Sequence, residues 1–142
     1  MADQFNEQQQ EELTEEFEKR RKKVTEEDIA KAIKRGKEKI EDLEKDVPKA
    51  LFSIFQDVKD MWLMLKDYWT KKYTTLPFGA ISAIVVGLLY LVSPFDIIFD
   101  FIPFVGYLDD AFVLTLALKI ISQDLEKYRI WKRTNEVENI NE

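Results

Sequence analysis

The sequence predicts an all-α membrane protein in which a helical hairpin follows a charged arm and an amphipathic helix. Residues 73–95 contain no charged side chain, and a helix of about 20 apolar residues is long enough to cross a bilayer. Lysine and arginine flank this stretch on both sides and do not occur within 73–118. Apolar residues over 48–72 recur at helical spacing, which is typical of an amphipathic helix.

Four units are predicted along the chain. They are a charged cytoplasmic helical arm over 1–46, an amphipathic aromatic-rich helix over 47–72, a membrane hairpin over 73–133 and a flexible tail over 134–142. The hairpin has one arm over 76–93, a second over 108–131 and a broken short helix between them. Because basic flanks stay on the cytoplasmic side, both termini are predicted to be cytoplasmic. The N-terminus shows no pattern of a secretory signal.

The composition argues against several classes of function. The chain has no cysteine and no histidine, so disulfides, the usual zinc sites and Ser-His-Asp triads are excluded. The net charge is −6 at pH 7, and no basic stripe with interleaved aromatic residues suggests nucleic-acid binding. We therefore expect no catalytic site, no enzyme activity and no nucleic-acid partner.

The charged arm begins with a segment, 3–23, in which acidic residues precede basic ones. This order suits the dipole of a helix. Its only large apolar residues are Phe5, Leu13 and Phe17, so we expect a solvated helix or a disordered segment. The alternative is a docking arm for a protein partner.

A second helix is predicted to start at Thr25, which can cap it, with Asp28 completing a capping box. The apolar positions then form a narrow seam of the coiled-coil type: Ile29, Ile33, Gly36, Ile40, Leu43 and Val47. The seam predicts packing within the chain or a homo-oligomer through the N-terminal helices. Pro48 marks the start of the next helix.

The aromatic-rich helix carries Trp62, Tyr68 and Trp69 close to the start of the uncharged stretch. Tryptophan and tyrosine favour the level of lipid headgroups, which predicts a helix lying on the membrane. A core helix of a soluble bundle has the same periodicity. Both alternatives stand at this point.

The region between the hairpin arms has a distinct sequence motif. Ser93 is predicted to cap a short helix that starts at Pro94, and Pro103 is predicted to end it. Gly106 suits a turn with positive φ. These four residues are the predicted structural motif of the hairpin.

Four aspartates are the only charged residues within 73–118: Asp96, Asp100, Asp109 and Asp110. Carboxylates at membrane depth suggest function, although Asp96, Asp109 and Asp110 could simply stabilise helix starts. Oxygen ligands around a turn also suit Ca²⁺ or Mg²⁺, so the four residues are a candidate metal site. An aspartyl-protease dyad is disfavoured because the chain lacks a Gly-x-Gly-Asp pattern.

The segment 90–110, YLVSPFDIIFDFIPFVGYLDD, resembles the signature of the YkvA-like family, also called DUF1232. The resemblance covers about residues 76–120 and departs from the family at Phe99, where proline is usual. It implies a small bacterial membrane protein of unknown biochemical role, placed in the inner (plasma) membrane. It implies no cofactor.

The function predicted from these observations is a non-enzymatic membrane anchor that presents a cytoplasmic interaction surface. Its partners would be membrane lipid and a protein or second copy bound by the N-terminal helices. The first alternative is a protein that binds or conducts divalent cations through the aspartates. Two others are a holin-like pore, which the family motif disfavours, and a soluble helical bundle that buries the hairpin.

Overall fold

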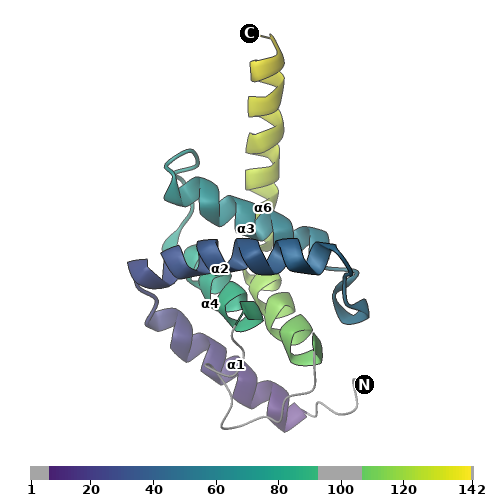
Figure 1. Cartoon of the computed structure of the whole chain (residues 1–142). Coiled ribbons are helices and arrows are strands. Elements are labelled where there is room, and N and C mark those ends of the chain that lie inside the picture. The colour runs from purple at the N-terminus through teal and green to yellow at the C-terminus, as the bar shows by residue number, and fades with distance from the viewer. Residues whose placement is uncertain (1–6, 93–106, 142) are drawn as a thin grey trace.

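The computed structural model describes residues 7–92 and 107–141, and these residues form α-helices and one short 3-10 helix. The elements are α1 (Glu7–Lys22), α2 (Glu26–Glu44), η2 (Lys49–Leu51), α3 (Phe55–Trp69), α4 (Phe78–Val92) and α6 (Tyr107–Asn141). Figure 1 shows α4 in the middle of the molecule, with α2 crossing it and α6 extending beyond the body. The all-α prediction is confirmed.

Helix α4 is the centre of the hydrophobic core. Every residue from 80 to 91 is buried, and α1, α2, α3 and α6 all pack against it. A helix that is apolar all round must be buried in protein or in lipid. In the described residues protein helices cover it, as in the predicted soluble-bundle alternative.

Helices α4 and α6, which fall in the two predicted hairpin arms, pack against each other, and this is the most extensive helix contact among the described residues. The membrane hairpin itself stays a prediction. Within 7–92 and 107–141, however, no helix combines the length and the apolar character needed to cross a membrane.

Helix α1 packs on the body, unlike the solvated helix expected from the sequence. Leu13 and Phe17 are only 1% and 2% exposed, and α1 contacts α4 and α6. Residues four apart share one face of a helix, so these two side chains are enough to form an apolar contact face. The sequence prediction overestimated the apolar area that such a helix needs in order to pack on the body.

Helix α2 starts as predicted. Thr25 Oγ1 accepts a hydrogen bond from the Asp28 amide at 3.2 Å, and the Asp28 carboxylate accepts one from the Thr25 amide at 2.9 Å. The apolar seam faces the core of its own chain, with Ile29, Ile40 and Leu43 buried. Of the two predicted uses of the seam, packing within the chain is the one observed.

The aromatic-rich segment is divided into η2 and α3 instead of forming one helix from Pro48. Helix α3 buries Val58, Met61, Met64 and Leu65, and the indole of Trp62 donates a hydrogen bond to the Ile33 carbonyl at 2.9 Å. Most of α3 is therefore a core helix. Its last residue, Trp69, is an exposed large hydrophobic residue.

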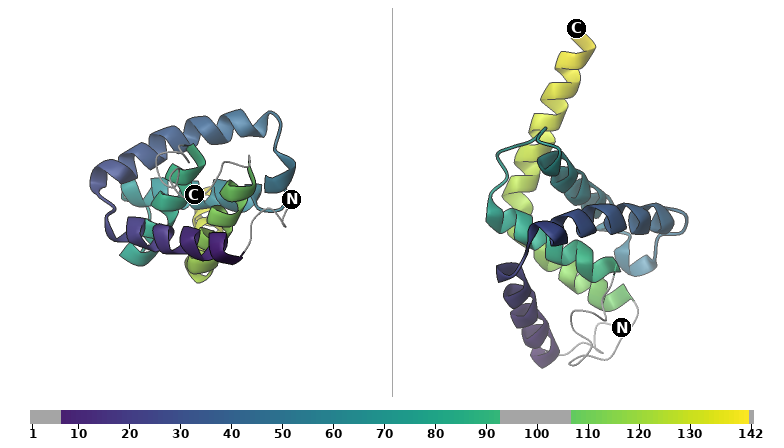
Figure 2. Two further views of the ribbon diagram at one scale, coloured as in Figure 1. Left: turned by 90° about the horizontal axis from the view of Figure 1, so that it is seen from below. Right: turned by 60° about the vertical axis from the view of Figure 1, so that its left-hand side comes forward.

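Helix α6 is longer than the predicted second arm and continues to Asn141 through residues expected to be a flexible tail. No glycine or proline interrupts the chain from 107 to 141, so nothing in the local sequence stops the helix. Its C-terminal end projects from the body, as Figure 1 and the right-hand view of Figure 2 show.

Candidate membrane-binding edge

Most of the predicted aspartate site and the whole predicted structural motif lie outside the described residues. The residues concerned are Ser93, Pro94, Asp96, Asp100, Pro103 and Gly106. The backbone of Asp109 and Asp110 lies in the first turn of α6, as predicted. In the part of the chain that is described, no group of three or more acidic side chains could hold a metal ion. The Ca²⁺ or Mg²⁺ site therefore stays a prediction.

A different candidate site lies where two connections meet, the α1–α2 turn and the α3–α4 loop. Both lie on one side of the molecule, which the right-hand view of Figure 2 brings forward. Between them is a groove of about 660 Å³. We call it the edge groove, and its apolar lining consists of Val24, Ile29, Tyr68, Trp69, Phe78 and Ile81.

Two large aromatic side chains are exposed at this groove. Trp69, the last residue of α3, is 41% exposed, and Phe78, the first residue of α4, is 58% exposed. Both also line the groove, so they form one apolar surface. Such a grouped surface indicates a binding site more strongly than a scattered apolar residue would.

Four exposed lysines lie in or beside the two connections that border the groove, Lys22 and Lys23 at the α1–α2 turn and Lys71 and Lys72 in the α3–α4 loop. Lys71 lines the edge groove, and Lys23 lines a neighbouring pocket that shares Val24 and Thr25 with it. Glu26 contributes a negative charge to the groove lining. We call the surface formed by Lys22, Lys23, Trp69, Lys71, Lys72 and Phe78 the basic edge.

Lys71 has an unusual backbone conformation, with φ of 67°. The Lys72 amide donates to the Asp67 carbonyl at 2.8 Å, and the Lys71 amide donates to the Tyr68 carbonyl at 3.1 Å. These two bonds are those of a Schellman motif, which places glycine most often at the position of Lys71. A lysine there carries a local conformational strain, and such strain is concentrated at functional sites.

Replacing Lys71 by glycine is expected to leave stability unchanged or raise it while weakening the basic edge. A left-handed conformation costs a non-glycine residue about 1–2 kcal/mol, and the extra freedom of glycine in the unfolded chain offsets roughly 0.5–1 kcal/mol of the gain. Denaturant unfolding should therefore show Lys71→Gly to be up to about 1 kcal/mol more stable. A loss of stability would show that the side chain itself supports the fold.

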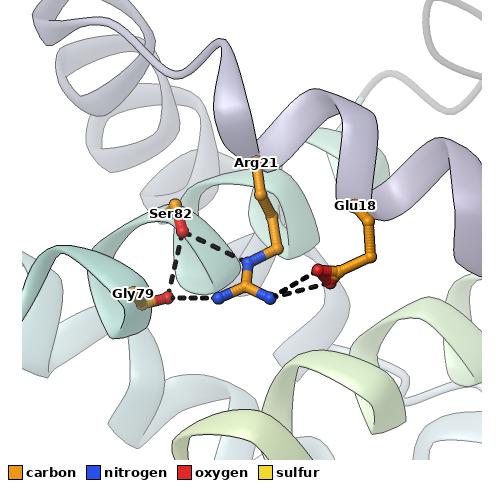
Figure 3. Close-up of polar contacts among 4 residues, drawn as sticks. All are labelled: Glu18, Arg21, Gly79 and Ser82. Carbon is orange, nitrogen blue, oxygen red and sulfur yellow. Dashed lines mark hydrogen bonds and ion pairs between the residues drawn. The ribbon is translucent and has the colours of Figure 1, made fainter.

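Arg21 fixes the C-terminal end of α1 to the start of α4. Figure 3 shows its guanidinium between the two helices. Its Nε donates to Ser82 Oγ at 3.2 Å and Nη2 donates to the Gly79 carbonyl at 2.9 Å, while Nη1 pairs with Glu18 at 2.7 Å. This contact holds the α1–α2 turn, and with it Lys22 and Lys23, against the helix that begins at Phe78.

The other end of the α3–α4 loop is held by α6. The Tyr128 hydroxyl donates to the buried Asp67 carboxylate at 2.6 Å, and the rings of Tyr73, Tyr128 and Trp131 pack with centroids 4.9–5.7 Å apart. The α3–α4 loop, which carries Lys71 and Lys72, is thus packed against α6. Its exposed side chains are presented by a fixed scaffold.

Arg129 adds a second link between α3 and α6. Its guanidinium pairs with Asp57 at 2.7 Å and with Asp60 at 2.8 Å. Burial alone would lower the pKa of Arg129, but the hydrogen bonds to the two aspartates and their charge raise it above its ordinary value. Arg129 therefore stays charged throughout the physiological range.

The sequence prediction included only part of this site. It placed Trp69 at a membrane interface and noted the lysines that flank the uncharged stretch. It did not identify Arg21 as an inward-facing residue, because in the basic run 19–23 nothing distinguishes it from its neighbours. The pairing of Asp67 with Tyr128, which are 61 residues apart, also left no local signal.

Comparison with known proteins confirms the predicted resemblance to the YkvA-like family. The family described as "Protein of unknown function (DUF1232)" matches residues 80–116, which lie within the predicted range. The chain is 32% identical over 77 residues to "Uncharacterized membrane protein YkvA" of Bacillus subtilis (strain 168), and the match covers 54% of this chain and 73% of that protein. No solved structure is significantly similar. The chain therefore belongs to the DUF1232 family of YkvA-like proteins.

Proposed function

We propose that this protein is a non-enzymatic membrane-associated protein that attaches to anionic lipid through the basic edge. The observation that supports this most directly is the grouping of exposed Trp69 and Phe78 with four exposed lysines. Aromatic rings favour the headgroup region, and lysines are attracted to anionic lipid. The relative described as a membrane protein agrees with this location.

The two kinds of side chain have separate roles in the proposed attachment. Each lysine near an anionic surface contributes about 1 kcal/mol at physiological ionic strength. The two aromatic rings enter the boundary between headgroups and acyl chains, where they keep the protein in one orientation. In this mode α4 remains the core of the folded chain.

The proposed anchor presents the C-terminal half of α6 to a partner. The C-terminal end of α6 projects from the body (Figure 1), and Ile130, next to the contact of Arg129 with α3, is 49% exposed. The surface would face the cytoplasm, as the basic flanks predict. A cation-binding role through the aspartates is the remaining alternative for the family motif.

The test is flotation of the purified full-length chain with phosphatidylglycerol vesicles. We expect the double substitution of Trp69 and Phe78 by serine to weaken binding by about tenfold or more, because two apolar rings no longer enter the lipid. The matched control is Phe52→Ser. Phe52 is 65% exposed. It follows η2, which lies near the C-terminal end of α2, whereas the basic edge lies near the N-terminal end of α2.

Two results would contradict the proposal. One is an equal loss of binding for the double variant and for Phe52→Ser, since binding would then not depend on the basic edge. The other is resistance of the bound protein to an alkaline carbonate wash. That result would instead favour insertion of the uncharged 73–95 stretch as the predicted hairpin.

A further inference from the structure

The edge groove offers more than a surface contact, because its volume and its largely apolar lining suit part of a ligand. Its volume of about 660 Å³ is within the range of about 300–1,000 Å³ that is usual for small-molecule sites. Six apolar or aromatic side chains line it, together with the exposed side chains of Lys71 and Glu26. The groove thus combines a largely apolar lining with a basic group that an anionic headgroup could meet.

We propose that the edge groove binds one acyl chain of an anionic lipid, with the anionic headgroup at Lys71. This inference rests on the proposed function and names the ligand of the basic edge. The charge pattern favours an anionic amphiphile by one positive charge, since the linings of the groove and of the adjoining pocket contain three basic and two acidic residues: Arg20, Lys23, Lys71, Glu26 and Asp28. The apolar lining requires that the rest of the ligand be hydrocarbon.

The position of the groove agrees with a ligand that enters from a membrane. Trp69 and Phe78 belong both to the groove lining and to the exposed surface. When these rings lie at the headgroup level, the groove mouth faces the lipid. A chain can then pass from the bilayer into the groove without crossing water.

Glu26 is the feature of the groove that opposes this ligand. Its carboxylate lines the groove and is one of the three acids in the first turn of α2. The Glu26→Gln variant is therefore expected to bind an anionic amphiphile more tightly than the native chain does. This direction would not be expected if the groove bound a cationic or neutral chain.

The test uses chain-brominated laurate, because bromine quenches tryptophan fluorescence on contact. The laurate is kept below its critical micelle concentration. We expect saturable quenching of the full-length protein with one laurate per chain and little quenching by a brominated alkylamine. Most of the signal should disappear in Trp69→Phe, since Trp69 lines the groove.

Filling the groove separates this inference from the proposed function. Thr74 is exposed and lines the groove, whereas Thr75 is exposed on the same loop and is not part of the lining. We expect Thr74→Trp to weaken laurate binding by about tenfold or more, whereas Thr75→Trp should bind laurate as the native chain does. Both variants should still bind phosphatidylglycerol vesicles, because Lys71, Lys72, Trp69 and Phe78 are intact.

Several outcomes would overturn the inference. If native protein binds vesicles but not laurate, or if Thr74→Trp binds laurate as tightly as Thr75→Trp, the groove holds no acyl chain and only the surface attachment stands. If neither the native chain nor the two threonine variants bind phosphatidylglycerol vesicles, the proposed function itself fails. If light scattering shows a dimer that Trp69→Ser converts to a monomer, a second copy of the chain covers the groove instead.

Discussion

The Gly87→Leu variant is expected to lose about 3 kcal/mol or more of its free energy of unfolding. A Cβ atom on Gly87 would lie 3.1 Å from Ala117 Cβ and 3.8 Å from both Leu114 Cδ2 and Met61 Cε. These three neighbours are fully buried, so an added side chain can be accommodated only if α4 and α6 move apart. Folded domains are stable by only about 5–15 kcal/mol, so the loss is a large part of the total.

Alanine variants at two glycines of α4 provide the control for helix propensity. Gly79→Ala places its Cβ 3.7 Å from Arg21 Nη2, an ordinary contact, so it should gain up to about 1 kcal/mol from propensity alone. The Gly87→Ala variant should be less stable than the Gly79→Ala variant, because its Cβ would lie only 3.1 Å from Ala117 Cβ. Urea unfolding measures all three. Equal stability of Gly87→Leu and native protein would show that α4 and α6 are not packed as closely as described.

Reversing the charge of four lysines at the basic edge is expected to abolish binding to anionic vesicles. The substitutions are Lys22→Glu, Lys23→Glu, Lys71→Glu and Lys72→Glu. If each lysine contributes about 1 kcal/mol, loss of all four attractions weakens binding roughly a thousandfold, and the new repulsion weakens it further. The side chains are exposed, so the fold should be retained, which circular dichroism and thermal unfolding would check.

The matched control reverses four exposed lysines away from the edge: Lys34, Lys37, Lys45 and Lys49. It changes the net charge by the same amount, and its residues begin in the middle of α2 and continue past its C-terminal end. We expect this variant to bind far better than the edge variant. Similar losses in both variants would mean that binding depends on net charge and not on the basic edge.

The sequence was sufficient to predict the helical class and the α2 capping box. Local patterns determine these features, since caps and periodicity act within a few residues. The burial partner of α4 could not be predicted, because a helix that is apolar all round looks the same whether protein or lipid covers it. The small residue Gly87 fits the close approach of α6.

The candidate site was less predictable than the fold. The lysines and Trp69 were visible in the sequence, but the edge groove exists only because the α1–α2 turn and the α3–α4 loop meet. Phe78 was one residue of an apolar run, and its exposure of 58% follows from its place at the very start of α4. The predicted aspartate site lies mostly outside the described residues and stays a separate prediction.

The central claim is that the basic edge attaches this protein to anionic lipid. The most direct measurement is a binding isotherm of the native chain on phosphatidylglycerol vesicles and on phosphatidylcholine vesicles, each at low and high salt. We predict strong binding to the anionic vesicles at low salt, a marked decrease at high salt through charge screening, and little binding to the zwitterionic vesicles. Equal binding to both kinds of vesicle, or none to either, would contradict the claim.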